Sequence, residues 1–411
     1  MKRKIKLLFD MEQLSINGFK GTGLVRVGSA LFEQLIHNEN IDLYPLVTTK
    51  RGNVIDYLKA KGYYEVLKNK IVYLPKLEKT TKNLKLSHRI WKRYLMSFYS
   101  RRYRKILSKF DAYFSVYNPI SDIVYQSDIK TFWMIHDVIP IVHPDCCSEK
   151  FIKKFKDWIQ RACPDAYFTI SNYTMQDFLR YKPSAKNTPM YTLYLGAQEH
   201  FKPCLDNEKI ERIKNKYHIQ TEKYFLAVSE ITKRKNLPHL LRAFVEFLDK
   251  TKAEDISLVL VGSVRKGYDE LAKSIDGLDR YQNKIVQTGY ADDEDLPALY
   301  SGATAFVYPS LYEGFGLPVL EGMQCGVPVV TCNNTSLPEV GGDAVVYISG
   351  DNVNETADVL NRLYTDDFLR KSLSEKGLIQ AQKFSWNKMA ADFVNAITKE
   401  TEKDLCAVES A

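Results

Sequence analysis

The chain has 411 residues, of which 45% are hydrophobic and 26% are charged, and its formal net charge is +8. This length is large for one hydrophobic core and suits two domains of ordinary size. Seven cysteines without a Cys-x-x-Cys pair indicate a reducing, cytoplasmic compartment and neither a disulfide framework nor a structural zinc site. No run of about 20 apolar residues is present, so no membrane-spanning helix is predicted.

The first elements in chain order are a strand over Lys4–Phe9 and a helix that begins near Leu24, with apolar residues at helical spacing. The loop between them is rich in glycine, which lets a backbone approach a ligand closely. Its glycines and one threonine are Gly18, Gly21, Thr22 and Gly23. A plain turn before a helix would have the same composition, so the loop alone does not identify a site.

Strands over Leu43–Val47 and Ile71–Leu74 follow, and the chain then changes character. The range Lys76–Lys109 holds twelve basic residues and one acidic residue, Glu78. Aromatic residues over Trp91–Tyr99 have the spacing of one helical face. Such a helix suits an anionic membrane surface, and we predict that residues 76–109 dock the protein on the inner face of the membrane. A packed helix with a solvated basic face is the alternative, and no recognised motif supports a nucleic-acid surface.

Two buried strands are predicted over Ala112–Val116 and Thr131–Ile135. The second runs directly into His136 and Asp137, and the carboxyl end of a strand is where parallel sheets bind ligands. His136 is therefore a candidate to orient a ligand hydroxyl, although it could also be a structural histidine with Asp137 as its partner. The other predicted elements of this half are a helix over Lys150–Arg161 and strands over Tyr167–Ile170 and Tyr191–Leu195.

The second half begins with a strand over Tyr224–Val228, and the turn after it carries Lys233, Arg234 and Lys235. Three cations between a strand and a helix form a favourable place for a diphosphate, and a solvated basic turn is the less favoured alternative. An acidic run over Asp292–Asp295 precedes another helix, where acidic side chains complement the helix dipole. We interpret that run as structural and not as a metal site.

The stretch between Ala305 and Thr331 is predicted to form a strand, a glycine-rich loop, a helix and a second strand. Glu313 lies in the loop, and Glu321 lies about one turn inside the helix. The free N–H groups at the helix start suit a phosphate. One carboxylate could then hold sugar hydroxyls while the other holds a ribose diol. Without further information, the pattern fits a glycine-rich turn with two solvated glutamates equally well.

The segment EGFGLPVLEGMQCGVPVV, which contains both glutamates, resembles the E-x7-E signature of the retaining glycosyltransferase family 4. The resemblance covers most of the chain and implies an α/β protein with the GT-B fold, in which two Rossmann-like domains with parallel sheets face an interdomain cleft. Residues 1–200 would form the acceptor-side domain and residues 201–385 the nucleotide-sugar domain. Residues 386–411 would form a helix that crosses back towards the first domain, with a polar, frayed tail after Thr398.

The resemblance also implies roles for single residues. Lys235 would neutralise the donor diphosphate, and Glu313 and His136 would hold the sugar and the acceptor, so these three are the expected catalytic residues. Ser229 and Glu230 depart from the family pattern, in which a glycine followed by arginine or threonine is common. The implied donor-binding residues are Arg234, Tyr290, Gly314, Phe315, Gly316, Leu317 and Glu321, and the implied acceptor loop is Gly21, Thr22 and Gly23.

The implied reaction transfers a hexose from a nucleotide diphosphate sugar to a hydroxyl of a saccharide or polyprenyl-linked acceptor, with retention of configuration and without a metal or other cofactor. The segment IHD-x-x-P resembles bacterial mannosyltransferases of surface-polysaccharide assembly, which favours mannose from GDP-mannose. Two other hypotheses stay open. A sugar-nucleotide epimerase of the same fold would need no acceptor, and a non-catalytic scaffold would bind a sugar nucleotide without turnover.

Overall fold

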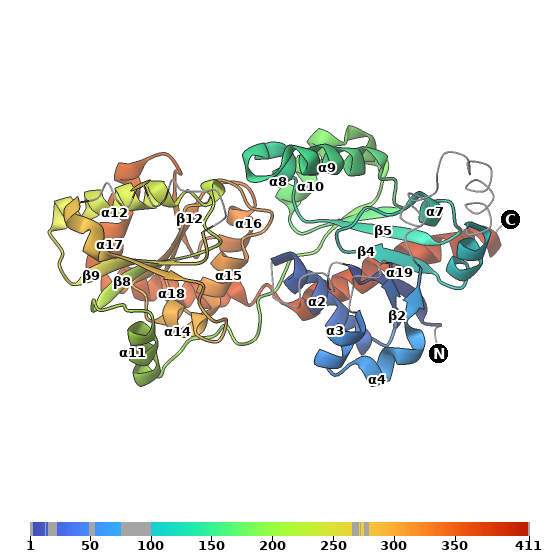
Figure 1. Cartoon of the computed structure of the whole chain (residues 1–411), viewed down its shortest axis with the longest axis horizontal. Coiled ribbons are helices and arrows are strands. Elements are labelled where there is room, and N and C mark those ends of the chain that lie inside the picture. The colour runs from blue at the N-terminus through green and yellow to red at the C-terminus, as the bar shows by residue number, and fades with distance from the viewer. Residues whose placement is uncertain are drawn as a thin grey trace, which may run out of the picture.

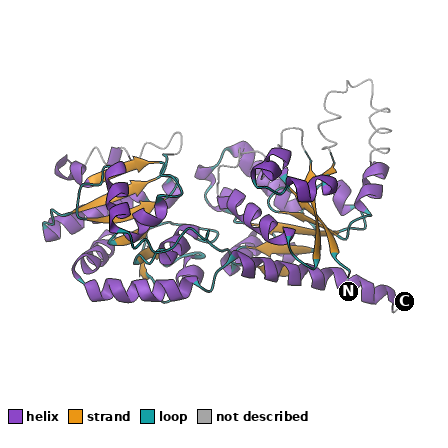
Figure 2. Ribbon diagram, turned by 90° about the horizontal axis from the view of Figure 1, so that it is seen from below, coloured by secondary structure: helices purple, strands orange, loops and turns teal. Residues whose placement is uncertain are grey.

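The computed structural model describes residues 3–12, 14, 23–48, 54–74, 100–264, 271, 273–274 and 279–409 of the chain. Two parallel β-sheets form the centres of two domains that lie side by side (Figure 1). Each sheet is sandwiched between helices (Figure 2). The α/β class with two Rossmann-like domains, predicted from the sequence, is confirmed.

The first sheet has the strand order β3-β2-β1-β4-β5-β6-β7, and all of its pairings are parallel. The order reverses at β1, which pairs with both β2 and β4, so the carboxyl end of β1 is a topological switch point where such sheets bind ligands. The strands are β1 (Ile5–Asp10), β2 (Ile41–Val47), β3 (Val72–Tyr73), β4 (Ala112–Ser115), β5 (Lys130–Ile135), β6 (Ala166–Thr169) and β7 (Met190–Thr192).

Side chains that alternate along these strands bury both faces of the first sheet. In β5, Phe132 and Met134 belong to one hydrophobic cluster, whereas Trp133 and Ile135 belong to a second cluster. Helices cover each face, since an uncovered face would expose one of these clusters. They are α2 (Gly23–Ile36), α3 (Val54–Ala60), α4 (Tyr64–Leu67), α7 (Asp122–Tyr125), α8 (Ile139–Val142), α9 (Glu149–Arg161) and α10 (Asn172–Tyr181).

The second sheet has the order β10-β9-β8-β11-β12-β13 and is again parallel. Its strands are β8 (Lys223–Val228), β9 (Ile256–Val261), β10 (Ile285–Gly289), β11 (Ala305–Tyr308), β12 (Val329–Cys332) and β13 (Val346–Ile348). Its helices are α11 (Asn207–Lys216), α12 (Leu237–Thr251), α14 (Leu296–Ser301), α15 (Leu317–Gln324), α16 (Leu337–Gly341), α17 (Val353–Thr365) and α18 (Asp367–Ala381).

The last helix, α19 (Trp386–Glu409), follows the second domain in the chain but packs on the first (Figures 1 and 2). The ring of Phe393 lies 4.7 Å from the ring of Phe114 in β4. The prediction of a polar, frayed tail after Thr398 was wrong, because the helix continues to Glu409. The sequence after Thr398 is polar, but the side chain of Glu400 is buried and accepts a hydrogen bond from the hydroxyl of Tyr191.

The chain passes between the domains twice, after β7 and again before α19, and the two passages touch. An ideal Cβ added to Gly196 in the first passage would lie 2.5 Å from the backbone nitrogen of Trp386. Only glycine fits such a close approach of two backbones.

The predicted amphipathic helix over Trp91–Tyr99 lies outside the described residues. The helical segment that follows, over residues 100–107, buries Tyr103 and Leu107 and exposes Arg101, Arg102, Arg104 and Lys105. Both hypotheses for the basic segment are compatible with that arrangement. None of the helices in the described ranges has the length and hydropathy needed to cross a bilayer.

Candidate active site

The carboxylate of Glu313 is the centre of a polar cluster at the carboxyl end of the second sheet. Its Oε1 atom accepts hydrogen bonds from Arg234 Nη1 and Lys235 Nζ, each at 2.6 Å. Ser310 Oγ donates to the same oxygen at 2.5 Å, and the hydroxyl of Tyr308 donates at 2.8 Å. The structure therefore brings together three of the predicted site residues from two separate loops.

The charges in this cluster are held away from water, since Glu313 and Lys235 are each only 8% exposed. Burial alone would raise the pKa of Glu313, but Arg234 and Lys235 lower it to about 2, so the carboxylate is ionised at neutral pH. Burial lowers the pKa of Lys235 to about 8, against the opposing effect of Glu313. At pH 7 two cations thus surround one anion, and the excess positive charge suits an anionic ligand.

The turn that presents the cations has a specific backbone shape. Arg234 and Lys235 lie on a single 3₁₀ turn, Lys233–Lys235, after β8. Asn236 ends the turn in the left-handed region with φ of 56°, which asparagine tolerates better than most residues. Its side-chain amide donates to the carbonyl of Gly350 at 2.7 Å, which helps to hold the turn that presents Lys235.

The loop that carries Glu313 contacts the first domain. The carbonyl of Gly314 accepts hydrogen bonds from Ser171 Oγ at 2.7 Å and from Thr174 Oγ1 at 3.1 Å, both in or next to α10. An ideal Cβ on Gly314 would lie 2.3 Å from the carbonyl oxygen of His136, so this contact requires glycine. Gly316, with φ of 109°, precedes α15 and also needs to be glycine.

His136 lies beside this contact but is almost enclosed. It is 7% exposed, and its Nε2 is 2.8 Å from the carbonyl oxygen of Val116. Burial lowers its pKa to about 4, so the ring is neutral at physiological pH. Asp137 is not its partner, because that carboxylate accepts a hydrogen bond from the backbone N–H of Ile139 at 2.9 Å, at the start of α8.

The second glutamate of the motif, Glu321, is buried in α15 and pairs with a residue of the first domain. Its Oε1 accepts from Arg26 Nη1 at 3.0 Å, and Arg26 Nη2 also donates to Asp293 at 3.1 Å. Burial raises the pKa of Glu321 to about 7, although Arg26 opposes the shift. Sequence reasoning did not predict the role of Arg26, whose only signal was its place in the pattern Gly-Thr-Gly-Leu-x-Arg.

The other predicted residues differ in their surroundings. Tyr290 follows β10 and is 67% exposed. Phe315 is buried against Tyr194 and Phe384, so its side chain is a packing residue. Gly23 begins α2, and an ideal Cβ added to it would lie 3.8 Å from Leu317 Cδ1, at the start of α15. Gly21 and Thr22 lie outside the described residues.

Two further features were not expected. Tyr308 and Ser310 both donate hydrogen bonds to Glu313. Tyr308 lies in an otherwise apolar strand, so the sequence did not indicate that its hydroxyl has a polar partner. The acidic run before α14 forms ion pairs instead of capping the helix, with Lys216 Nζ 2.8 Å from Asp292 and 2.5 Å from Asp295. Within the described ranges, no three His, Cys, Asp or Glu side chains are grouped to hold a metal ion.

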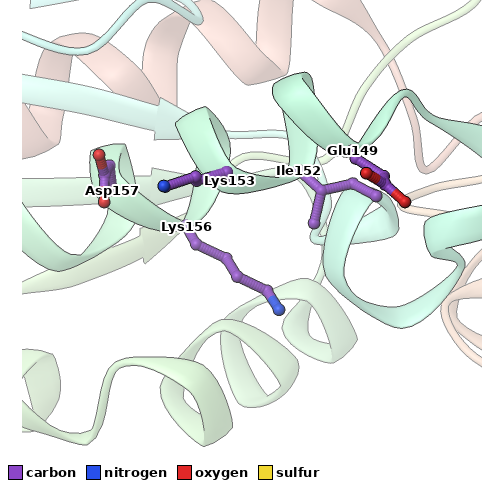
Figure 3. Close-up of a pocket in the computed structure, with 5 residues that line it drawn as sticks. All are labelled: Glu149, Ile152, Lys153, Lys156 and Asp157. Carbon is purple, nitrogen blue, oxygen red and sulfur yellow. The ribbon is translucent and has the colours of Figure 1, made fainter.

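A separate hollow of about 430 Å³ lies on the first domain (Figure 3). It is lined by one face of α9, with the side chains of Glu149, Ile152, Lys153, Lys156 and Asp157. None of the predicted site residues lines it, so it does not belong to the Glu313 cluster.

Comparison with known proteins shows what the second domain is similar to. Residues 209–379 match the family model described as glycosyl transferases group 1. Over these residues the second domain is similar to group 1 glycosyl transferases. That domain includes Arg234, Lys235, Tyr290, Glu313 and Glu321, whereas His136 and Arg26 lie outside the matched range.

Two of the curated relatives of the chain come from Escherichia coli. The O-antigen chain mannosyltransferase B is 39% identical over 181 residues, which are 44% of this chain and 47% of the relative. The serotype-specific mannosyltransferase WbdA is 32% identical over 280 residues, which are 66% of this chain and 33% of the relative. The match thus spans at most about half the length of either relative.

Solved structures match almost the whole chain in fold. The Anabaena protein HepE in complex with UDP and glucose has a TM-score of 0.67 at 13% identity, covering 99% of this chain and 100% of that one. WaaG, a glycosyltransferase of lipopolysaccharide biosynthesis, has a TM-score of 0.64 at 14% identity, covering 96% and 100%. The predicted GT-B fold is therefore confirmed, with the residues matched by the family model in its second half.

Proposed function

We propose that the protein transfers a mannosyl group from GDP-mannose to a hydroxyl of a saccharide or polyprenyl-linked acceptor, with retention of configuration. The observation that carries the proposal is the cluster in which Arg234 and Lys235 surround the buried Glu313 beside the first domain. The names of the two E. coli relatives favour mannose as the sugar. The UDP in the Anabaena structure supports a nucleotide diphosphate as the donor.

Charge development explains why this cluster suits the reaction. Breaking the bond between C1 of the sugar and the phosphate oxygen leaves negative charge on the diphosphate and positive charge on the ring. Lys235 and Arg234 would stabilise the diphosphate, with help from the dipole at the start of α15. The preorganised cations need no reorientation when the bond breaks, which is the usual source of electrostatic catalysis.

The acceptor would approach from the first domain, past His136. Its oxygen forms the new bond to C1 while the bond from C1 to the phosphate oxygen breaks, and the departing phosphate takes the acceptor proton. In this scheme the neutral ring of His136 and the carboxylate of Glu313 orient hydroxyls and transfer no proton. Retention follows if the acceptor attacks the face that the phosphate leaves.

A screen of nucleotide sugars tests the proposal. GDP-mannose should raise the unfolding temperature more than UDP-glucose does, because a ligand that binds only the folded state stabilises it by mass action. Proton NMR of the product should then show an α-mannoside and free GDP. Turnover of the donor without an acceptor would favour the epimerase hypothesis. Stabilisation without any turnover across a panel of saccharide and lipid-linked acceptors would favour the scaffold.

Donor affinity should depend on pH through Lys235. Since the pKa of Lys235 is about 8, affinity for GDP-mannose should fall as the pH rises through that value and the ammonium loses its charge. The substitution Lys235→Arg should keep the cation and move this loss to higher pH. Calorimetric titration at several pH values measures the effect. An identical alkaline decline in both proteins would contradict the role of Lys235.

Transfer should not require a divalent metal, because Lys235 and Arg234 supply the positive charge near the diphosphate. Activity with saturating donor should be unchanged after treatment with EDTA. Loss of activity that Mn²⁺ or Mg²⁺ restores would show that the cations are not sufficient.

We also propose that residues 76–109 dock the protein on the inner leaflet, so that a lipid-linked acceptor can reach the cleft. Binding to anionic vesicles should weaken, without vanishing, as salt screens the charges over a Debye length of about 10 Å at 0.1 M. Replacing Lys92, Arg93, Arg101 and Arg102 with glutamate should release the protein. Equal binding to zwitterionic vesicles would refute docking.

A matched control tests whether position or total charge matters. Four exposed basic residues of the second domain can be replaced by glutamate to give the same change in net charge: Arg212, Lys252, Lys371 and Lys376. This variant should sediment with anionic vesicles almost as the wild type does. If it is released as fully as the first variant, binding depends on overall charge and not on the segment.

A further inference from the structure

We infer that Arg26, a residue of the first domain, is a positioning residue of the donor site in the second domain. Its guanidinium holds the Glu321 carboxylate ionised and oriented to accept hydrogen bonds from the ribose hydroxyls of the donor. The inference rests on the proposed function, in which Glu321 binds the nucleotide.

The contact between Arg26 and Glu321 joins the two domains directly. Arg26 projects from α2 and Glu321 from α15, and Figure 1 shows these helices on facing sides of the two domains. The guanidinium is forked, with Nη1 3.0 Å from Glu321 Oε1 and Nη2 3.1 Å from Asp293 Oδ1. Two anchors of this kind fix the plane of a guanidinium and therefore the direction of the carboxylate that it binds.

The surroundings of Glu321 make this cation necessary. The glutamate is 4% exposed, and the phenol of Tyr300 in α14 lies 3.4 Å from its Oε2. The negative charge of Asp293 also raises the pKa of Glu321, whereas the hydrogen bond from Tyr300 lowers it. His200 lies near Arg26 and Asp293, and its burial lowers its pKa, so it adds no positive charge at neutral pH. Arg26 is thus the cation that faces Glu321 among the groups known to act on it.

Ionisation of Glu321 matters because a ribose diol donates hydrogen bonds to a carboxylate. A protonated carboxyl group has less acceptor capacity and is a weaker acceptor. Burial places the pKa of Glu321 at about 7 even with Arg26 present. Donor affinity should therefore weaken as the pH falls through about 7, as the carboxylate takes up a proton. Without Arg26 the pKa is higher, and the same weakening begins at higher pH.

The competing explanation is that Arg26 only holds the domains together. Other contacts already do this, since Glu339 in α16 accepts from the backbone N–H groups of Asn172 and Tyr173 at 2.8 and 2.7 Å. Tyr312 also donates to Asp177 across the interface at 2.6 Å. A purely structural role for Arg26 predicts no change in the pH at which donor binding is lost.

The test measures the dissociation constants of GDP-mannose and UDP-glucose by calorimetry between pH 5.5 and 8 (about the range in which Glu321 titrates). At pH 7, Arg26→Gln should weaken binding about tenfold or more, because a hydrogen bond to a buried charge is lost. The pH at which half of the donor affinity is lost on the acid side, here called the acid midpoint, should rise by about one unit or more in this variant. Arg26→Lys should restore much of the wild-type midpoint, because it keeps the cation.

Two matched variants separate charge from packing. Asp293→Asn removes a repulsive neighbour and should move the acid midpoint down, opposite to Arg26→Gln. Glu321→Gln should remove the loss of affinity on the acid side and hold binding near the weak level that the wild type reaches at acid pH. If Arg26→Gln keeps the wild-type midpoint while Glu321→Gln removes the loss of affinity on the acid side, the inference is wrong and the proposed function stands. If neither nucleotide sugar binds the wild type, the proposed function itself fails.

Discussion

Replacing Lys235 by methionine should lower kcat/KM for sugar transfer by about 10²- to 10³-fold, the usual effect of removing one preorganised electrostatic contact. Methionine keeps most of the aliphatic stem and removes the charged nitrogen, which lies 4.6 Å from the centroid of the Tyr308 ring. Glu313 remains paired with Arg234, so the loss should appear in catalysis and not in folding. Steady-state kinetics and urea unfolding on the same preparation distinguish the two.

The neighbouring Lys233 provides the control for this substitution. Its side chain is 67% exposed and lies 3.8 Å from Asp145, a long contact for an ion pair. An exposed pair of this kind contributes little, so Lys233→Met should leave kcat/KM within a few-fold of the wild type. Equal losses in both variants would mean that the turn acts through its overall charge, and the assignment of Lys235 would then be wrong.

Replacing Glu313 by alanine should have a different and equally large effect. Arg234 and Lys235 would then remain buried without their counter-ion, and breaking a buried ion pair on one side costs about 3–5 kcal/mol of stability. Transfer should be lost, because the sugar-holding carboxylate is gone. Affinity for GDP should be kept or increased, because the diphosphate meets two cations that no carboxylate competes for.

Urea unfolding with and without GDP measures both effects on Glu313→Ala. The free energy of unfolding should fall without ligand, and GDP should restore more of it than it adds to the wild type. A variant that loses transfer but keeps both its stability and its wild-type response to GDP would show that Glu313 does not balance the charge of the cations.

Most strand positions could be predicted because buried parallel strands are short apolar runs that glycine, proline or polar residues end. The strand predicted over Tyr224–Val228 differs from β8 by one residue. The proximity of Lys235 and Glu313 could also be anticipated, since the carboxyl ends of parallel strands meet at one edge of a sheet. Those inferences need only local patterns within one domain.

The contacts that escaped prediction depend on information that is not local. Arg26 and Glu321 are 295 positions apart, and their pairing requires the placement of one domain against the other. The continuation of α19 beyond Thr398 depends on Tyr191, which lies in a distant edge strand. A polar composition cannot show which face of a helix another domain will bury.

The close contact between Gly196 and Trp386 has a consequence for how the protein moves. Because the two passages touch there, that point would act as the hinge if one domain rotated relative to the other. Rotation about that hinge can open the cleft, but sliding of one domain past the other would pull the two backbones apart. Opening by rotation would also withdraw Arg26 from Glu321 and Ser171 from Gly314 together. One rotation would then both open the cleft to ligands and break these contacts, and its reversal would close the cleft and form them again.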